Sequence, residues 1–230
     1  MVSLACLAGF LLVIICKSNA EDQAGVSSEY SEAFVNLLYV FNGNFTDRLL
    51  VEAYKNINDP DVDVPHHVAV VSIPVWIPAL GQAVTYLYEE YFKKTLLRRL
   101  ICVLWELSDG EIFMQPYNIT SPPNDMSKIF TLDQVGNLTY DDLRTRMECR
   151  TKFERKGTHT FKASVPDCDD KDGGVIPKYF LTWSCNSLVA VANNPSQDEY
   201  SAIPIVTVRE GPRYPFPPYM NGIENRVTCE

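Results

Sequence analysis

The stretch that decides the fold is residues 84–107, VTYLYEEYFKKTLLRRLICVLWEL. It contains two runs rich in β-branched and aromatic residues, 84–91 and 96–107, and such runs are typical of consecutive strands. Within the second run, LICVLW at residues 100–105 is continuously apolar, which predicts a strand that is buried. The segment therefore indicates a β-rich protein.

Six further runs of this kind surround the pair, each bounded by Pro, Gly, Asn or Asp. They cover residues 68–73, 111–117, 149–155, 158–165, 178–187 and 202–208. Eight strands in one domain hide their edges best in a closed barrel or a sandwich, and an antiparallel barrel of about eight strands can hold one small ligand. We expect a mainly β fold, a closed antiparallel β-barrel with a lipocalin-like calyx.

The N-terminal part of the chain has a helical period instead. Its apolar stripe, at i, i+4, i+7, i+8 and i+11, consists of Tyr30, Phe34, Leu37, Leu38 and Phe41. Ser28 is the expected N-cap, and Gly43 follows the end of the helix. A shorter helix is expected from residue 46 or 47 to about 56, so the barrel should carry one or two N-terminal helices.

Composition and motifs exclude several classes of protein. The net charge is −9, from 20 basic and 29 acidic side chains, which argues against nucleic acid as a partner. The chain has no phosphate-binding glycine loop, no Gly-x-Ser-x-Gly, no His-Glu-x-x-His and no Cys-x-x-Cys. The three histidines, His66, His67 and His159, are expected at the surface, and we predict no metal site.

The first twenty residues have the pattern of a secretory signal peptide. Residues 4–16 are almost purely apolar, and Ser18-Asn19-Ala20 places small residues before a cut after Ala20. The apolar run is shorter than the roughly 20 residues that cross a bilayer. We expect a secreted, extracellular protein with one domain over residues 21–230 and no membrane span; an uncleaved membrane anchor is the alternative.

Five cysteines follow the signal segment, and cysteines of exported proteins tend to pair. Cys102 lies in the apolar run and is expected to stay unpaired. Cys149 and Cys168 flank a predicted hairpin with its turn near residues 156–158, so we expect a disulfide between them. Cys185 and Cys229 are then paired by elimination.

Three Asn-x-Thr sequons accompany the signal segment and point to a glycoprotein. They begin at Asn44, Asn118 and Asn137, each expected in a loop or at the end of an element.

An ordered set of motifs runs through most of the chain. The segments are Gly43-Asn44-Phe45-Thr46, Pro74-Val75-Trp76, Gly81, residues 86–90, Arg98-Arg99, Tyr117 and Cys149. Over residues 32–216 their order resembles the CpcT/CpeT chromophore lyase family. The chain departs from the family at Glu90 in place of Gln, at Leu96-Leu97 in place of Tyr-Arg, and at the residue before Cys149, which is Glu in place of Gly.

The resemblance implies a barrel that holds a linear tetrapyrrole (bilin), requires no cofactor, and delivers the bilin to a cysteine of an acceptor protein. Glu89 or Glu90 is the expected catalytic carboxylate near the pyrrole nitrogens, and Arg99 the expected partner of a propionate. The expected ligand-binding wall is aromatic and consists of Trp76, Tyr86, Tyr88 and Tyr117. Trp76 could instead be a simple plug of the barrel.

Strand geometry leaves the choice of carboxylate open. Glu89 and Glu90 face opposite sides of a strand, so at most one points inward, and an outward Glu89 could pair with Lys93 or Lys94. Tyr86 and Tyr88 share a face with Glu90 unless a bulge intervenes.

Two functions are therefore expected from the sequence. The first is a bilin lyase; the second is a secreted, non-catalytic carrier of a small apolar ligand or pigment. The signal segment, the sequons and the cysteines favour the carrier, because an exported lyase would not meet an acceptor that is assembled inside the cell. A second copy of the chain is a further candidate partner.

Overall fold

The computed structural model describes residues 30–57, 67–120, 131–145, 149–165, 168–169, 175–176, 178–193 and 204–229. Ten antiparallel strands form a closed barrel in the order β4-β3-β2-β1-β13-β12-β11-β8-β7-β5, and pairing of β5 with β4 closes it. Their bounds are β1 (Gly43–Thr46), β2 (Val68–Val75), β3 (Val84–Phe92), β4 (Thr95–Glu106), β5 (Ile112–Ile119), β7 (Thr151–Gly157), β8 (Thr160–Val165), β11 (Lys178–Trp183), β12 (Ser187–Asn193) and β13 (Ile205–Arg209). The predicted mainly β, closed antiparallel barrel is confirmed.

Three two-residue strands lie beside the barrel. β6 (Leu143–Arg144) adds to β5, whereas β9 (Cys168–Asp169) and β10 (Val175–Ile176) pair only with each other.

Strand β1 was not expected, because its four residues are too few to show a period of two. It forms because β2 and β13 pair with it on either side. Gly43 has a φ of +150°, and a Cβ there would lie 2.1 Å from Nη1 of Arg209. Glycine is therefore required at position 43, between α1 and the first strand of the barrel.

The first two helices agree with the predicted pattern except at one cap, and the third was not predicted. The helices are α1 (Glu32–Phe41), α2 (Arg48–Lys55) and α3 (Leu132–Gly136), with 3-10 turns at Pro78–Leu80, Tyr140–Asp142 and Pro218–Met220. The N-cap of α1 is Ser31, whose Oγ accepts a hydrogen bond from the amide of Phe34 at 3.1 Å. Ser28, the expected cap, lies outside the described residues.

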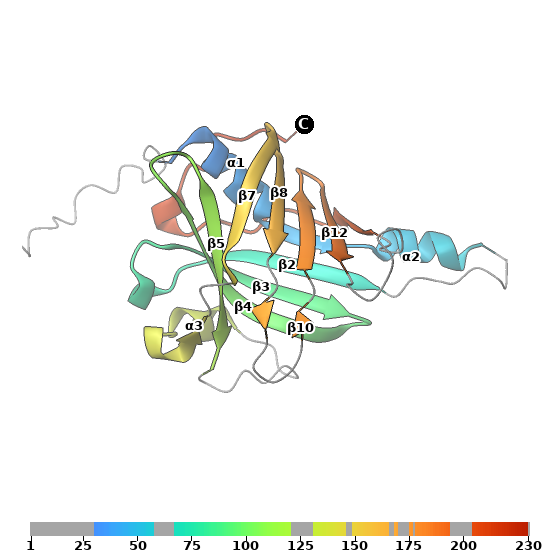
Figure 1. Cartoon of the computed structure of the whole chain (residues 1–230), viewed down its shortest axis with the longest axis horizontal. Helices are drawn as coiled ribbons and strands as arrows, with labels where there is room; N and C mark the ends of the chain where they lie inside the picture. Colours follow the sequence, from blue (N-terminus) through green and yellow to red (C-terminus); the bar gives the residue numbers. More distant parts are fainter. Residues whose placement is uncertain are drawn as a thin grey trace, which may run out of the picture.

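Helix α1 and the C-terminal segment, which is the chain that follows β13, cover the same end of the barrel (Figure 1). Phe34 and Phe41 of α1 pack in one core cluster with Met220, Ile223 and Val227 of that segment. A disulfide between Cys185 and Cys229 joins the segment to the β11–β12 connection. This end of the barrel is therefore closed.

A second core cluster lies on the outer face of the barrel, where the chain around α3 packs against β2, β3, β4 and β5. Its buried residues are Val75, Ile77, Leu87, Ile101, Ile119, Val135, Leu138 and Leu143. Strands β3 and β4 are thus buried on both faces, which explains why LICVLW shows no alternation of apolar and polar residues.

Candidate functional site

The barrel encloses a cavity of about 110 Å³ that is open to solvent at its mouth. Strands on every side contribute to a mainly apolar wall, which includes Val70, Leu100, Met114, Leu181 and Leu188. Sites for small molecules are typically concave and mainly apolar, with a few polar groups in the wall. The cavity is therefore the candidate ligand site.

Aromatic rings line the cavity near the closed end. The rings of Phe41, from α1, and Trp183, from β11, lie 4.7 Å apart between centroids, and Phe45 packs against Trp183 at 5.1 Å. Tyr88 stacks on Phe41 at 6.4 Å. Of these rings, Phe41, Tyr88 and Trp183 line the cavity and offer flat surfaces to a conjugated or alicyclic ligand.

Alternation along β3 turns Tyr86, Tyr88 and Glu90 toward the interior. Tyr88 and Glu90 line the cavity, as expected for one of the two carboxylates. Tyr86 lies deeper, in the core, where its hydroxyl donates to the carbonyl oxygen of Leu38 at 2.7 Å. Burial is the main cause that raises the pKa of Tyr86 well above its ordinary value. Tyr86 therefore supports the wall from beneath.

The cavity wall also carries one pair of opposite charges among its described residues, Glu90 and Arg98. They are direct cross-strand neighbours on β3 and β4, and Oε2 of Glu90 lies 3.9 Å from Nη1 of Arg98. Their side chains are 26% and 33% exposed, so the pair lies where the cavity meets solvent. This loose contact leaves most of the guanidinium donors of Arg98 open to a ligand.

The expectation that Arg99 faces the cavity is wrong. Arg98 lines the cavity, and Arg99 points to the outer face of the barrel. Nε of Arg99 donates to Oε1 of Glu89 at 2.6 Å, and the side chains are only 2% and 12% exposed. The hydroxyl of Tyr91 donates to the other oxygen of Glu89 at 2.7 Å. Burial, followed by this hydrogen bond, raises the pKa of Tyr91 to about 12. Glu89 and Arg99 therefore form a buried ion pair on the outer face.

Two residues of the expected aromatic wall also lie outside the cavity. Trp76 follows the last residue of β2 and is 54% exposed, so it is neither wall nor plug. Tyr117 packs against the outer core cluster, while its neighbour Pro116 lines the cavity. The error at Tyr117 arises because the sequence does not show which face of a strand is the inner one, whereas Trp76 lies beyond the end of its strand.

Several cavity residues were not singled out from the sequence as ligand contacts. Trp183, Leu181 and Leu188 come from the C-terminal strands β11 and β12, and Thr151 begins β7. The spacing of two between Leu181 and Trp183 shows that both side chains share one face of the strand. Only the register of the barrel shows that this face is the inner one.

The cysteines follow the expected pairing as far as the structure describes them. Cys185 and Cys229 are bonded, with a Cα–Cα distance of 5.5 Å, which confirms this pair. Cys102 is the free cysteine among the described residues and lines the cavity; burial raises its pKa to about 12. Cys149 is also in a disulfide. The side chain of Cys168 lies outside the described residues, so the pair of Cys149 with Cys168 stays a prediction.

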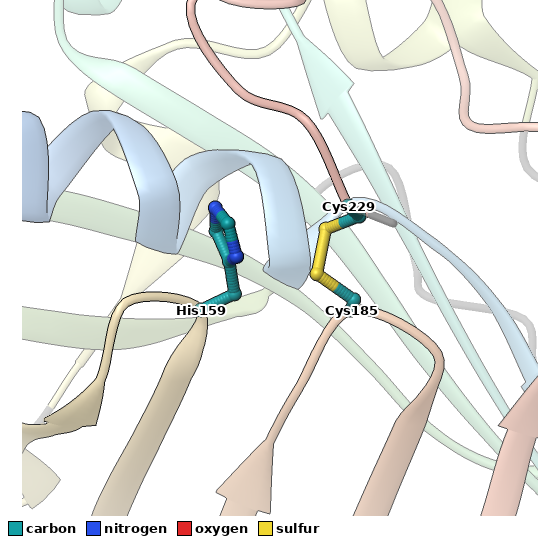
Figure 2. Close-up of side chains that lie close together, drawn as sticks. All are labelled: His159, Cys185 and Cys229. Atoms are coloured by element: carbon teal, nitrogen blue, oxygen red, sulfur yellow. A yellow bond between two sulfur atoms is a disulfide. The ribbon is translucent and has the colours of Figure 1, made fainter.

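His159 lies beside the Cys185–Cys229 disulfide (Figure 2), with one ligand atom from each residue within 4.8 Å of the others. The two sulfur atoms are bonded to each other, whereas metals bind cysteine as the thiolate. Arg213 also approaches this position, since its Nη2 lies 3.4 Å from Sγ of Cys229. The group is therefore a structural cross-link with a neighbouring cation and imidazole.

The sequons lie on the surface of the barrel in two cases. Asn118, near the end of β5, and Asn137, the C-cap of α3, are exposed. Asn44 is half-buried within β1, where we had expected a loop or an element end.

No family model and no curated protein matches the chain. The likeness to the chromophore lyases therefore rests on the motifs of the sequence. Within the described ranges, no helix combines the length and the apolar composition needed to cross a bilayer.

Proposed function

We propose that the protein binds one small, mostly apolar ligand inside its barrel, as a secreted carrier. The observation that carries this proposal is the cavity inside the barrel, with its apolar wall, its closed end and one charged pair near the mouth. Such a site removes an apolar ligand from water, and the charged pair near the mouth can orient it. The expected signal segment, sequons and disulfides fit a carrier that works outside the cell.

A linear tetrapyrrole is the ligand class that the resemblance suggests. Its conjugated rings can stack on Tyr88 and Phe41, which line the cavity. Its propionates need a cation, and Arg98 replaces Arg99 in this role because Arg98 is the arginine of the cavity wall. Biliverdin is therefore the first probe.

A second candidate function is bilin attachment, and the carboxylate of Glu90 in the cavity wall favours it. The thiol of an acceptor cysteine would add across a carbon–carbon double bond of the bilin. The new bond joins sulfur to one carbon, and the thiol proton ends on the adjacent carbon, so no oxidant is needed. Glu90 would stabilise a protonated pyrrole nitrogen or supply its proton. Incubation of bilin-loaded protein with an acceptor that has a free cysteine tests for a covalent product.

Titration with biliverdin tests the binding proposal. We expect saturable one-to-one binding that quenches tryptophan fluorescence, because Trp183 lies in the cavity wall. Ala190→Phe would fill the cavity from β12 and should abolish binding. Val206→Phe adds the same ring at an exposed position of β13 and should leave binding unchanged. If neither biliverdin, palmitate nor retinal binds the folded wild type, the proposal is refuted.

A further inference from the structure

Two side chains of the cavity wall carry polar atoms that have no hydrogen-bond partner among the described residues. They are Nε1 of Trp183 and Oγ1 of Thr151. The side chains are almost fully buried, with 0% of Trp183 and 1% of Thr151 exposed. Buried polar groups are paired in the large majority of cases, and an unpaired one destabilises the fold. These two atoms are therefore candidates for contact with a ligand.

The indole N–H of Trp183 restricts the chemistry of that ligand. It is a donor only, so its partner must carry a lone pair. The rings of Phe41 and Phe45 pack against Trp183 and offer no oxygen or nitrogen acceptor. Thr207, another polar residue of the wall, already donates from its hydroxyl to the carbonyl of Leu188 at 3.0 Å. The indole N–H of Trp183 therefore lacks a hydrogen-bond acceptor among these neighbours.

The acceptor at this position should be neutral. Trp183 lies near the closed end, beside α1, while the cation of the described cavity wall, Arg98, lies near the mouth and is one-third exposed. A carboxylate beside Trp183 would be buried without a counter-ion, which is strongly unfavourable. A carbonyl oxygen accepts the same hydrogen bond at no such penalty.

We infer that the cavity contains a deep hydrogen-bonding subsite, formed by the indole N–H of Trp183, that takes a ligand carrying a carbonyl-type oxygen on its buried part. Thr151 supplies a hydroxyl elsewhere on the wall, which donates to or accepts from a second polar atom of the ligand. This inference rests on the proposed function and adds the ligand class. A ketone, aldehyde or lactam should be preferred over a hydrocarbon of the same shape.

Two probes of matched shape test the subsite. The first is 6-propionyl-2-(dimethylamino)naphthalene, a ketone, and the second is its 6-propyl analogue, which lacks the oxygen. Isothermal titration calorimetry with the wild type should show about tenfold tighter binding of the ketone, the value of one hydrogen bond. The infrared carbonyl band of the bound ketone should move to lower frequency.

The decisive variant is Trp183→Phe, which keeps an aromatic ring and removes the N–H. Both probes should then bind with equal affinity, and the carbonyl band should return to the position it has in an apolar solvent. Trp105→Phe is the matched control, because Trp105 is half-buried, stacks on Phe113 and does not line the cavity; it should keep the tenfold preference. Thr151→Val should reduce the preference for biliverdin, which has several polar atoms, over the propyl probe.

The outcomes separate this inference from the proposed function. If neither probe nor biliverdin binds the wild type, the proposed function fails. If both probes bind the wild type equally, or if Trp183→Phe keeps the tenfold preference, the subsite is wrong while ligand binding stands. Should Trp183→Phe fail to fold, the wild-type preference and its infrared band decide the matter.

Discussion

Replacing the adjacent residues Arg98 and Arg99 with alanine, one at a time, should produce opposite effects. Arg98 lines the cavity, whereas Arg99 is buried against Glu89 on the outer face of the barrel. We expect Arg98→Ala to weaken ligand binding and to leave stability nearly unchanged. Arg99→Ala should destabilise the fold and leave the cavity wall intact.

The magnitudes follow from burial and distance. Arg99 and Glu89 are 2% and 12% exposed and 2.6 Å apart, so loss of the guanidinium leaves a buried carboxylate without its counter-ion. Removal of one partner from such a pair lowers the free energy of unfolding by about 3–5 kcal/mol. The Arg98–Glu90 contact is 3.9 Å and one-quarter to one-third exposed, so its loss should change stability by only about 0–1 kcal/mol. For a bound propionate, loss of Arg98 should cost about 2–3 kcal/mol, or roughly 30- to 150-fold in affinity.

Urea unfolding under non-reducing conditions, followed by tryptophan fluorescence, measures the effect on stability. Calorimetric titration with biliverdin measures the effect on binding. The double variant Glu89→Leu/Arg99→Met is the matched control, because replacing both charges with apolar side chains should recover most of the stability lost in Arg99→Ala.

Two results would refute the reasoning. One is an equal loss of stability in Arg98→Ala and Arg99→Ala. The other is folded Arg99→Ala protein that binds biliverdin more weakly while Arg98→Ala binds it normally, since the guanidinium facing the ligand would then belong to the outer residue.

Three further predictions concern cross-links and buried groups. Cys185→Ser should lower the free energy of unfolding by about 4 kcal/mol, because the lost bond with Cys229 spans 44 residues; urea unfolding measures this. The pKa of about 12 keeps the Cys102 thiol protonated, so an aromatic disulfide reagent at pH 8 should react with it only after unfolding. Tyr86→Phe removes the 2.7 Å hydrogen bond to Leu38 and should lower stability by about 1 kcal/mol in thermal unfolding.

Each of these has a contrary outcome. Unchanged stability of Cys185→Ser would mean that the C-terminal segment stays in place without its cross-link. Rapid labelling of Cys102 in native protein would show that the thiol is not shielded in the cavity wall. A Tyr86→Phe variant as stable as the wild type would show that the hydroxyl contributes nothing to holding α1.

The periodicity of side chains was enough to predict most of the elements. Runs of β-branched and aromatic residues predicted the longer strands, and the stripe from Tyr30 to Phe41 predicted α1, because these patterns depend only on local geometry. The free Cys102 and the Cys185–Cys229 bond could also be predicted, since an apolar run buries one thiol and the expected pair of Cys149 with Cys168 leaves Cys185 for Cys229. Four-residue β1 was missed because its partners, β2 and β13, are distant in sequence.

The choice of inner and outer face was decided by the tertiary structure alone. Alternation showed that Tyr86, Tyr88 and Glu90 share one face of β3, but not that this face lines the cavity. Strands β3 and β4 are buried on both sides, by the interior and by the cluster beneath α3, so hydrophobicity gives the two faces nearly equal weight. A shift of one residue exchanges Arg98 for Arg99, and only closure of the barrel between β4 and β5 determines which of them faces the ligand.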